Sequence, residues 1–180
     1  MKKKICLLLL GVVCLLMLGG CGSDSQQTDS DPLAGTSWIA DNDGSQWVFR
    51  DDGSFSWYRD KTVTDDYYYA GDYTVHRGQA AVDYLVDGLS QYDGFAEMSR
   101  SREYIEQLIS QQEQFDEDYN LNNFICFSCD NKSYMLDGQE QLSSEWITAY
   151  YGFILDEDNS LAIMNLRTGS YYGFSRETEE

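Results

Sequence analysis

The chain has 180 residues, with 31 Asp and Glu against 12 Lys and Arg, and a formal net charge of −19 at pH 7. This acidity excludes nucleic-acid binding, because no basic patch is available to displace the counterions of phosphates. It favours solubility, and it would attract cations or basic partners. The length suits a single domain that buries its core without metal or disulfide staples.

The first 20 residues have the three parts of a secretory signal. Residues 2–4 are lysines, residues 5–17 are apolar apart from Gly11, and Leu18-Gly19-Gly20 precedes Cys21 at the cleavage site. The apolar run is shorter than the about 20 residues of a membrane span. A chance cysteine after an ordinary secretory signal is the alternative. Removal of this leader would leave nine basic residues against 31 acidic ones, a formal charge of about −22.

Residues 18–21 resemble the bacterial lipobox. The resemblance implies cleavage before Cys21 and lipidation of its sulfur by acyl chains such as palmitate. The expected product is anchored in the membrane through Cys21, on the extracytoplasmic face of a bacterial cell. Residues 21–32 then form a polar, acidic and flexible spacer that ends at the only proline. We expect one domain over residues 33–175 and a frayed tail over 176–180.

The first part of the domain has the pattern of antiparallel strands. Predicted strands at 36–40, 46–50 and 54–59 are separated by Asp-Gly turns, which are strong hairpin signals. A longer strand at 67–76 is expected to bend or bulge at Gly71. We expect Trp38, Trp47 and Trp57 to contribute to the core, with the Asp-Gly tips facing solvent.

Helical spacing replaces this pattern at about 79–113. The better helix is predicted from about 95 to 112. Its apolar stripe consists of Met98, Ile105, Leu108 and Ile109, extended by Phe95 and Phe115.

Strand patterns return after residue 123. Strands are predicted at 124–129, 133–136, 147–155, 161–166 and 171–174, with a turn at 130–132. Cys126 and Cys129 lie three apart on one strand and should point to opposite faces, so we expect free thiols. The fold class is therefore mostly β. We expect an antiparallel meander sheet or small barrel of about 8–9 strands, with a helical insertion that plugs or flanks it.

Gly35 and Trp38, at the head of the first strand, resemble the opening Gly-x-Trp of lipocalin-like barrels. Two residues, Thr36 and Ser37, separate them here, where the family has one. The mid-chain helix also departs from lipocalins, whose helix follows the barrel. The arrangement looks more like small lipocalin-like lipoproteins of Gram-positive bacteria. The resemblance implies a cup that holds a small apolar ligand or has collapsed into a packed core.

No motif predicts catalysis, a metal or a cofactor. His76 is the only histidine, and it has neither a nucleophile elbow nor a second histidine to complete a site. Two acidic tips offer calcium-type oxygens, although hairpin turns explain them better. The four candidates are Asp41, Asp43, Asp156 and Asp158.

Three tyrosine doublets are the candidate binding residues. They are Tyr68 and Tyr69, Tyr150 and Tyr151, and Tyr171 and Tyr172. Each doublet on a strand sends one ring to each face, and we expect the outward rings to converge on one aromatic surface. The leading hypothesis is a monomeric, non-enzymatic lipoprotein that binds a glycan, a cationic partner or a protein. The alternatives are a carrier with a cavity inside the barrel and a hydrolase with a carboxylate pair.

Overall fold

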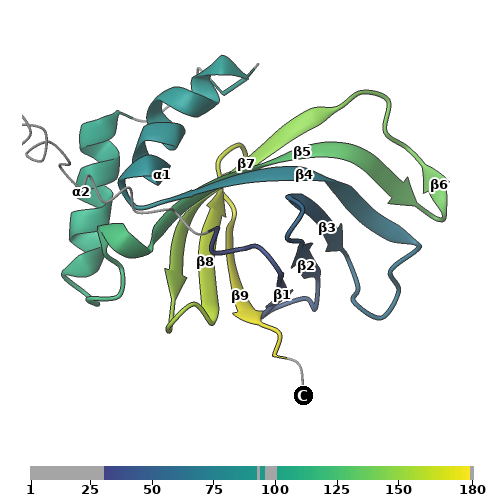
Figure 1. Cartoon of the computed structure of the whole chain (residues 1–180), viewed down its shortest axis with the longest axis horizontal. Helices are drawn as coiled ribbons and strands as arrows, with labels where there is room; N and C mark the ends of the chain where they lie inside the picture. Colours follow the sequence, from purple (N-terminus) through teal and green to yellow (C-terminus); the bar gives the residue numbers. More distant parts are fainter. Residues whose placement is uncertain (1–30, 93, 96–100, 179–180) are drawn as a thin grey trace, which may run out of the picture.

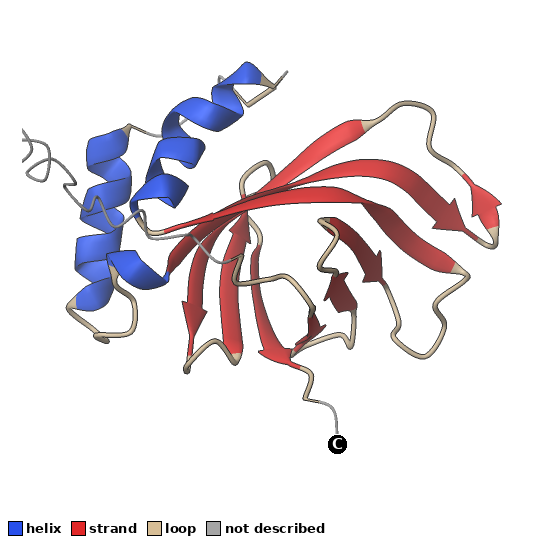
Figure 2. Cartoon of the chain, viewed as in Figure 1, coloured by secondary structure: helices blue, strands red, loops and turns tan. Residues whose placement is uncertain are grey.

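The computed structural model describes residues 31–92, 94–95 and 101–178 as a mostly β domain. Eight antiparallel strands form a closed barrel, with one extra strand and a helical insertion (Figures 1 and 2). The predicted fold class is confirmed, with four strands before the insertion and five after it. The nine strands are β1 (Thr36–Ala40), β2 (Gln46–Phe49), β3 (Ser54–Tyr58), β4 (Tyr67–Arg77), β5 (Phe124–Leu136), β6 (Gln139–Glu140), β7 (Trp146–Leu155), β8 (Ser160–Asn165) and β9 (Tyr171–Arg176).

Two pairings between strands distant in sequence close the barrel. The first strand, β1, pairs with the last, β9, and β4 pairs with β5 along its whole length. The connections therefore alternate between two ends. We call the end with connections 41–45, 59–66, 137–145 and 166–170 the open end. The opposite, closed end carries turns 50–53 and 156–159, the helical insertion and the beginning of the described chain, whereas Glu177, after β9, contacts Gln46 and Lys61 near the open-end connections.

The insertion flanks the barrel rather than plugging it. Helix α1 (Gln79–Asp83) continues as a π-helical turn (Tyr84–Gly88) and a 3₁₀ turn (Leu89–Gln91), and α2 (Arg102–Glu113) follows. Figure 1 shows α1 and α2 together on the side of the molecule opposite β6. Their buried side chains, among them Leu85, Ile105 and Ile109, share one core with outward residues of β5, β7 and β8. No described helix is long and apolar enough to cross a membrane.

The helical stripe agrees only in part with its prediction. The stripe residues Ile105 and Ile109 are buried, as is Phe95, whereas Met98 lies outside the described residues. The prediction for Phe115 is wrong, because its side chain is 88% exposed. Helix α2 ends at Glu113, so Phe115 falls beyond the last turn that faces the barrel.

A second core fills the barrel interior. It is rich in aromatic rings, including the fully buried Trp38, Phe49 and Phe127. Strand alternation separates the two cores, so that Cys126 lies under the helices while Cys129 lies inside the barrel. Both thiols are free, and burial raises the pKa of each. Their placement on opposite faces of one strand is as predicted.

Strand β5 corrects the prediction of a turn at 130–132. The chain stays extended there because it has a partner on each side: Gly71 of β4 faces Asn131, and Asn131 faces Trp146 of β7. Lys132 is the extra residue of a β-bulge opposite Ala70 and Gly71, and it forms an ion pair with Asp72. An irregularity therefore occurs at Gly71, as predicted, but its extra residue belongs to β5 and not to β4.

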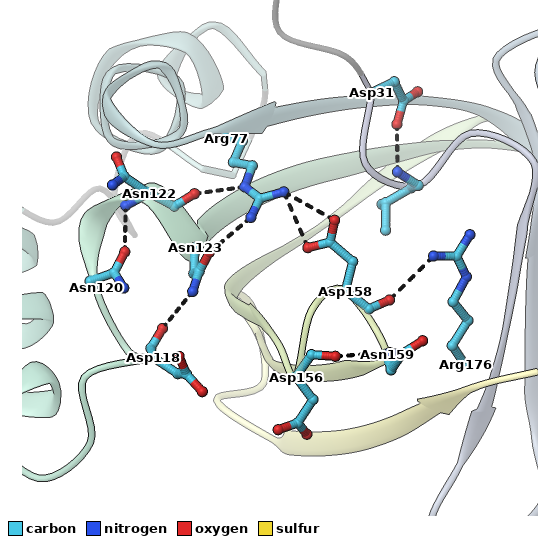
Figure 3. A network of polar contacts seen from close by, with 11 residues as sticks. Asp31, Arg77, Asp118, Asn120, Asn122, Asn123, Asp156, Asp158, Asn159 and Arg176 are labelled. Atoms are coloured by element: carbon cyan, nitrogen blue, oxygen red, sulfur yellow. Dashed lines mark hydrogen bonds and ion pairs between the residues drawn. The ribbon is translucent and has the colours of Figure 1, made fainter.

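A polar network covers the closed end (Figure 3). The guanidinium of Arg77 donates to the carbonyl of Asn122 at 2.6 Å and to the side chain of Asn123 at 2.8 Å. It also forms an ion pair with Asp158 at 3.2 Å, and Arg176 donates to the carbonyl of Asp158 at 3.4 Å. The network ties the helical insertion to the β7–β8 turn and to the end of β9.

Ordered contacts extend beyond both predicted domain boundaries. Asp31 was expected in the spacer, yet it accepts hydrogen bonds from the Leu33 amide at 2.8 Å and the Tyr73 hydroxyl at 2.7 Å. Arg176 belongs to β9, and the Glu177 amide donates to the Ser37 carbonyl at 2.8 Å. Glu177 is held because β1 and β9 are neighbours in the closed barrel, whereas Asp31 is held by its contact with Tyr73 of β4. The leader, Cys21 and residues 179–180 lie outside the described residues.

Candidate ligand-binding cavity

A cavity of about 370 Å³ lies at the open end of the barrel. Nine of its thirteen lining residues are aromatic, and three of them are among the chain's four tryptophans. The aromatic residues are Trp47, Phe55, Trp57, Tyr67, Tyr69, Trp146, Tyr150, Tyr172 and Phe174. The volume falls within the range of small-molecule sites, and so does the mainly apolar lining.

Strand alternation accounts for this gathering of rings. Phe55 and Trp57 are two apart on β3, as are Tyr67 and Tyr69 on β4, so each pair shares the inner face. The register then sets Trp57 beside Trp47 on one side and Tyr69 on the other. Three neighbouring strands thus present one continuous aromatic wall to the barrel interior.

The rings adjoin one another at widely different angles. The ring centroids of Tyr69 and Trp146 are 5.6 Å apart and their planes meet at 83°. The centroids of Trp57 and Tyr67 are 5.9 Å apart, with an interplanar angle of 84°. On the neighbouring strand β5, Tyr134 lies directly opposite Tyr69 and stacks on it with ring centroids 4.6 Å apart. The cavity therefore offers both ring faces and ring edges to a bound molecule.

The four polar residues of the lining are mostly engaged already. Asn131 is 3% exposed, and its amide nitrogen donates to the carbonyls of Cys129 and Trp146 at 3.1 and 3.0 Å. The same nitrogen also donates to Thr148 Oγ1 at 3.3 Å. At the mouth, Asp43 accepts from the amide of Ser45 at 3.0 Å. Asp43 is the single charged residue in the described lining.

Burial raises the pKa of two phenols of the cavity, Tyr69 and Tyr150. Desolvation raises the pKa of Tyr69, and its contacts with Tyr67 and Tyr134 add to that increase. Desolvation likewise raises the pKa of Tyr150. These tyrosines therefore act as neutral aromatic groups at physiological pH.

The tyrosine doublets converge through their inward members, not their outward ones. Tyr69, Tyr150 and Tyr172 all line the cavity. The outward surface does not form, because the other three rings lie apart: Tyr68 packs beside Tyr58, Tyr151 is buried under the helices, and Tyr171 is 63% exposed on β9. Tyr151 is buried because the helical insertion packs over the outer face of β5, β7 and β8. The sequence alone does not indicate over which strands the insertion packs.

Three of the four calcium candidates serve other contacts through their side chains. Asp41 accepts from Ser175 at 2.9 Å, Asp158 pairs with Arg77, and Asp43 caps its own turn. Asp41 and Asp156 do meet, in a polar hollow of about 230 Å³ that Asp116 and Asp118 also line. Within the described ranges, no group of three or more His, Cys, Asp or Glu side chains is arranged to hold a metal ion.

The only histidine lies away from the cavity. His76 is near the end of β4, with its ring 4.3 Å from that of Tyr84 in the helical insertion. It is half-buried rather than fully exposed as a surface histidine would be. No described lining residue of the cavity is a histidine.

Comparison with protein-family models, with curated proteins and with solved structures found no match. A function for this chain therefore has to follow from the cavity. Sequence reasoning named three of its thirteen lining residues as binding residues and Asp43 as a calcium candidate, and it missed Trp146. It expected Trp47 and Trp57 in the core: Trp47 is buried there and also lines the cavity, whereas Trp57 is only half-buried. The alternation of aromatic residues along β3, β4 and β7 was the available signal.

Proposed function

We propose that this protein is a lipid-anchored envelope protein whose barrel binds a small, largely apolar ligand at its open end. The observation that carries the proposal is the cavity of about 370 Å³ walled by nine aromatic side chains. Such rings supply a large contact area, and their positions on paired strands pre-organise them. A carrier with an internal cavity is thereby favoured over an outward binding surface.

The direction of the cavity suits a tethered binding protein. The described chain begins at Asp31 on the closed end, and the cavity opens at the other end. A lipid on Cys21 would be linked to Asp31 by about ten residues, which reach at most about 35 Å. The cavity would then face away from the membrane and towards ligands arriving from outside.

The composition of the lining also favours binding over hydrolysis. A glycosidase uses two carboxyl groups on either side of the scissile bond. The described lining of the cavity contains one carboxylate, Asp43.

The third doublet offers a matched pair of variants to test ligand binding. N-phenyl-1-naphthylamine, a neutral dye that fluoresces in apolar sites, should show a saturable signal with one site per chain. Tyr172→Ala removes a ring of the cavity and should weaken binding about fivefold, which corresponds to about 1 kcal/mol. Tyr171→Ala removes the adjacent exposed ring and should leave binding unchanged.

Two results would contradict the proposal. One is a dye signal that does not saturate in the folded protein. The other is equal weakening by the Tyr171 and Tyr172 variants, which would place the dye outside the cavity.

The anchor is tested separately by Cys21→Ala. This variant should lose incorporation of a radioactive fatty acid and leave the membrane fraction, because stable anchoring requires acyl chains on the sulfur. Ser23→Ala is the matched control and should remain lipidated. Persistent labelling of the Cys21 variant would show that the lipid is elsewhere or absent.

A further inference from the structure

We infer that the ligand of this cavity is an organic cation, of the quaternary-ammonium class, held by the aromatic wall and Asp43. This inference rests on the proposed ligand-binding function and narrows it to one chemical class. Three features of the described residues support it: the ring faces, the single charge in the lining, and the prior engagement of the polar groups.

The aromatic wall has the composition of a cation-binding site. Cations bind over the faces of Trp and Tyr because the face of the ring carries partial negative charge, and the attraction grows when water is excluded. Trp57, Tyr69 and Trp146 adjoin at centroid distances of 5.5 and 5.6 Å. Their planes differ by 39° and 83°, so rings of different orientation meet around one space.

One ring of the wall already holds a cation. The guanidinium of Arg59 lies 5.2 Å from the centroid of Tyr67. Arg59 is in the connection from β3 to β4 at the open end, where a ligand would enter. The contact shows that a positive group is accommodated against this wall.

The charge of the cavity has the matching sign. Asp43 lines it at the mouth, and no lysine or arginine belongs to its described lining. The whole chain carries a formal charge of −19, which attracts cations and repels anions. An anionic ligand would meet the Asp43 carboxylate, and the basic group beside the wall, Arg59, is already engaged with the ring of Tyr67.

A sugar fits the polar groups less well. Its many hydroxyls need free donors and acceptors, yet Asn131 is already bound to Cys129, Trp146 and Thr148. A quaternary ammonium has no N–H groups that need acceptors, and the ring faces together with Asp43 would offset the cost of taking its charge out of water.

Choline and its neutral isostere 3,3-dimethylbutan-1-ol test the inference as a matched pair. Each is titrated by calorimetry and by displacement of N-phenyl-1-naphthylamine from the full chain. Choline should bind at least about tenfold more tightly than the isostere. Its affinity should fall when salt rises from about 20 to about 200 mM, because a screened charge pair contributes less.

Two variants test whether the Trp146 ring and the Asp43 carboxylate cause the preference for choline over the isostere. Trp146→Leu keeps an apolar side chain without a ring face, and Asp43→Asn removes the charge while keeping an acceptor for the Ser45 amide. Each should lower the ratio of choline to isostere affinity about fivefold. Asp52→Asn is the control, because Asp52 is exposed and lies outside the cavity lining. It should leave the ratio unchanged.

The outcomes separate the two levels of the argument. If the dye binds, three results overturn the inference and leave the proposed function standing. They are equal affinities for choline and the isostere, no displacement of the dye by choline, and tighter binding of glucose than of choline. Absence of binding by the dye, choline and the isostere overturns both. A ratio that falls equally in the Asp52 variant attributes the preference to net charge and also overturns the inference.

Discussion

Replacing Trp38 by alanine is expected to lower the free energy of unfolding by about 3–5 kcal/mol. The side chain is 0% exposed and belongs to the core inside the barrel. Its indole nitrogen also donates to the hydroxyl of Thr36 at 2.7 Å, which leaves Thr36 without that partner in the variant. Urea unfolding followed by far-ultraviolet circular dichroism measures the change.

Two further variants show whether burial is the cause. Phe115→Ala removes an aromatic side chain that is 88% exposed and should stay within about 0.5 kcal/mol of the parent. Trp57→Ala should lie between the two, because Trp57 is only half-buried at the edge of the cavity. Sequence analysis treats Trp38, Trp47 and Trp57 alike, and the structure separates Trp57 from the others. A near-neutral Trp38 variant would show that the first meander is not part of the core.

Gly71→Ala is expected to lower the free energy of unfolding by about 3 kcal/mol or more, at the upper end of overpacking costs. Gly71 faces β5 at the bulge, and an added Cβ would overlap the carbonyl oxygen of Asp130. The obstacle is backbone, so it cannot rotate away. The β4–β5 pairing is one of the two that close the barrel, so the clash would weaken a contact on which closure depends.

Gly173→Ala is the matched control for this steric effect. Gly173 is also a strand glycine, in β9, and an added Cβ would lie 2.7 Å from a carboxylate oxygen of Asp41. That oxygen is the end of a side chain that can turn aside, at the loss of one hydrogen bond from Ser175. The expected loss is no more than about 1 kcal/mol. Equal losses in both alanine variants would contradict a backbone clash at Gly71.

The errors at β5 and at the tyrosine doublets have one physical origin. Asp130, Asn131 and Lys132 are typical of a turn, but two flanking strands supply the hydrogen bonds that hold them extended. In the doublets, the alternation of rings was predicted, yet a period of two does not say which face is inside. Tyr69 and Tyr172 became cavity residues only because the sheet curls towards them.

Local chemistry by itself determined the order of elements in this protein. Asp-Gly turns and alternating apolar residues predict four strands, a helical insertion and a second group of strands, although they divide β5 in two and miss β6. The leader that ends at Cys21 is likewise a prediction from local sequence alone. The tertiary structure alone decided that β1 meets β9 and β4 meets β5, which face is enclosed, and where the helices lie. Those contacts join residues more than 45 positions apart, as with Gly71 and Asn131, so no short-range pattern encodes them. The cavity forms only when β1 pairs with β9 and β4 pairs with β5, because strands on both sides of each of these pairings contribute lining residues.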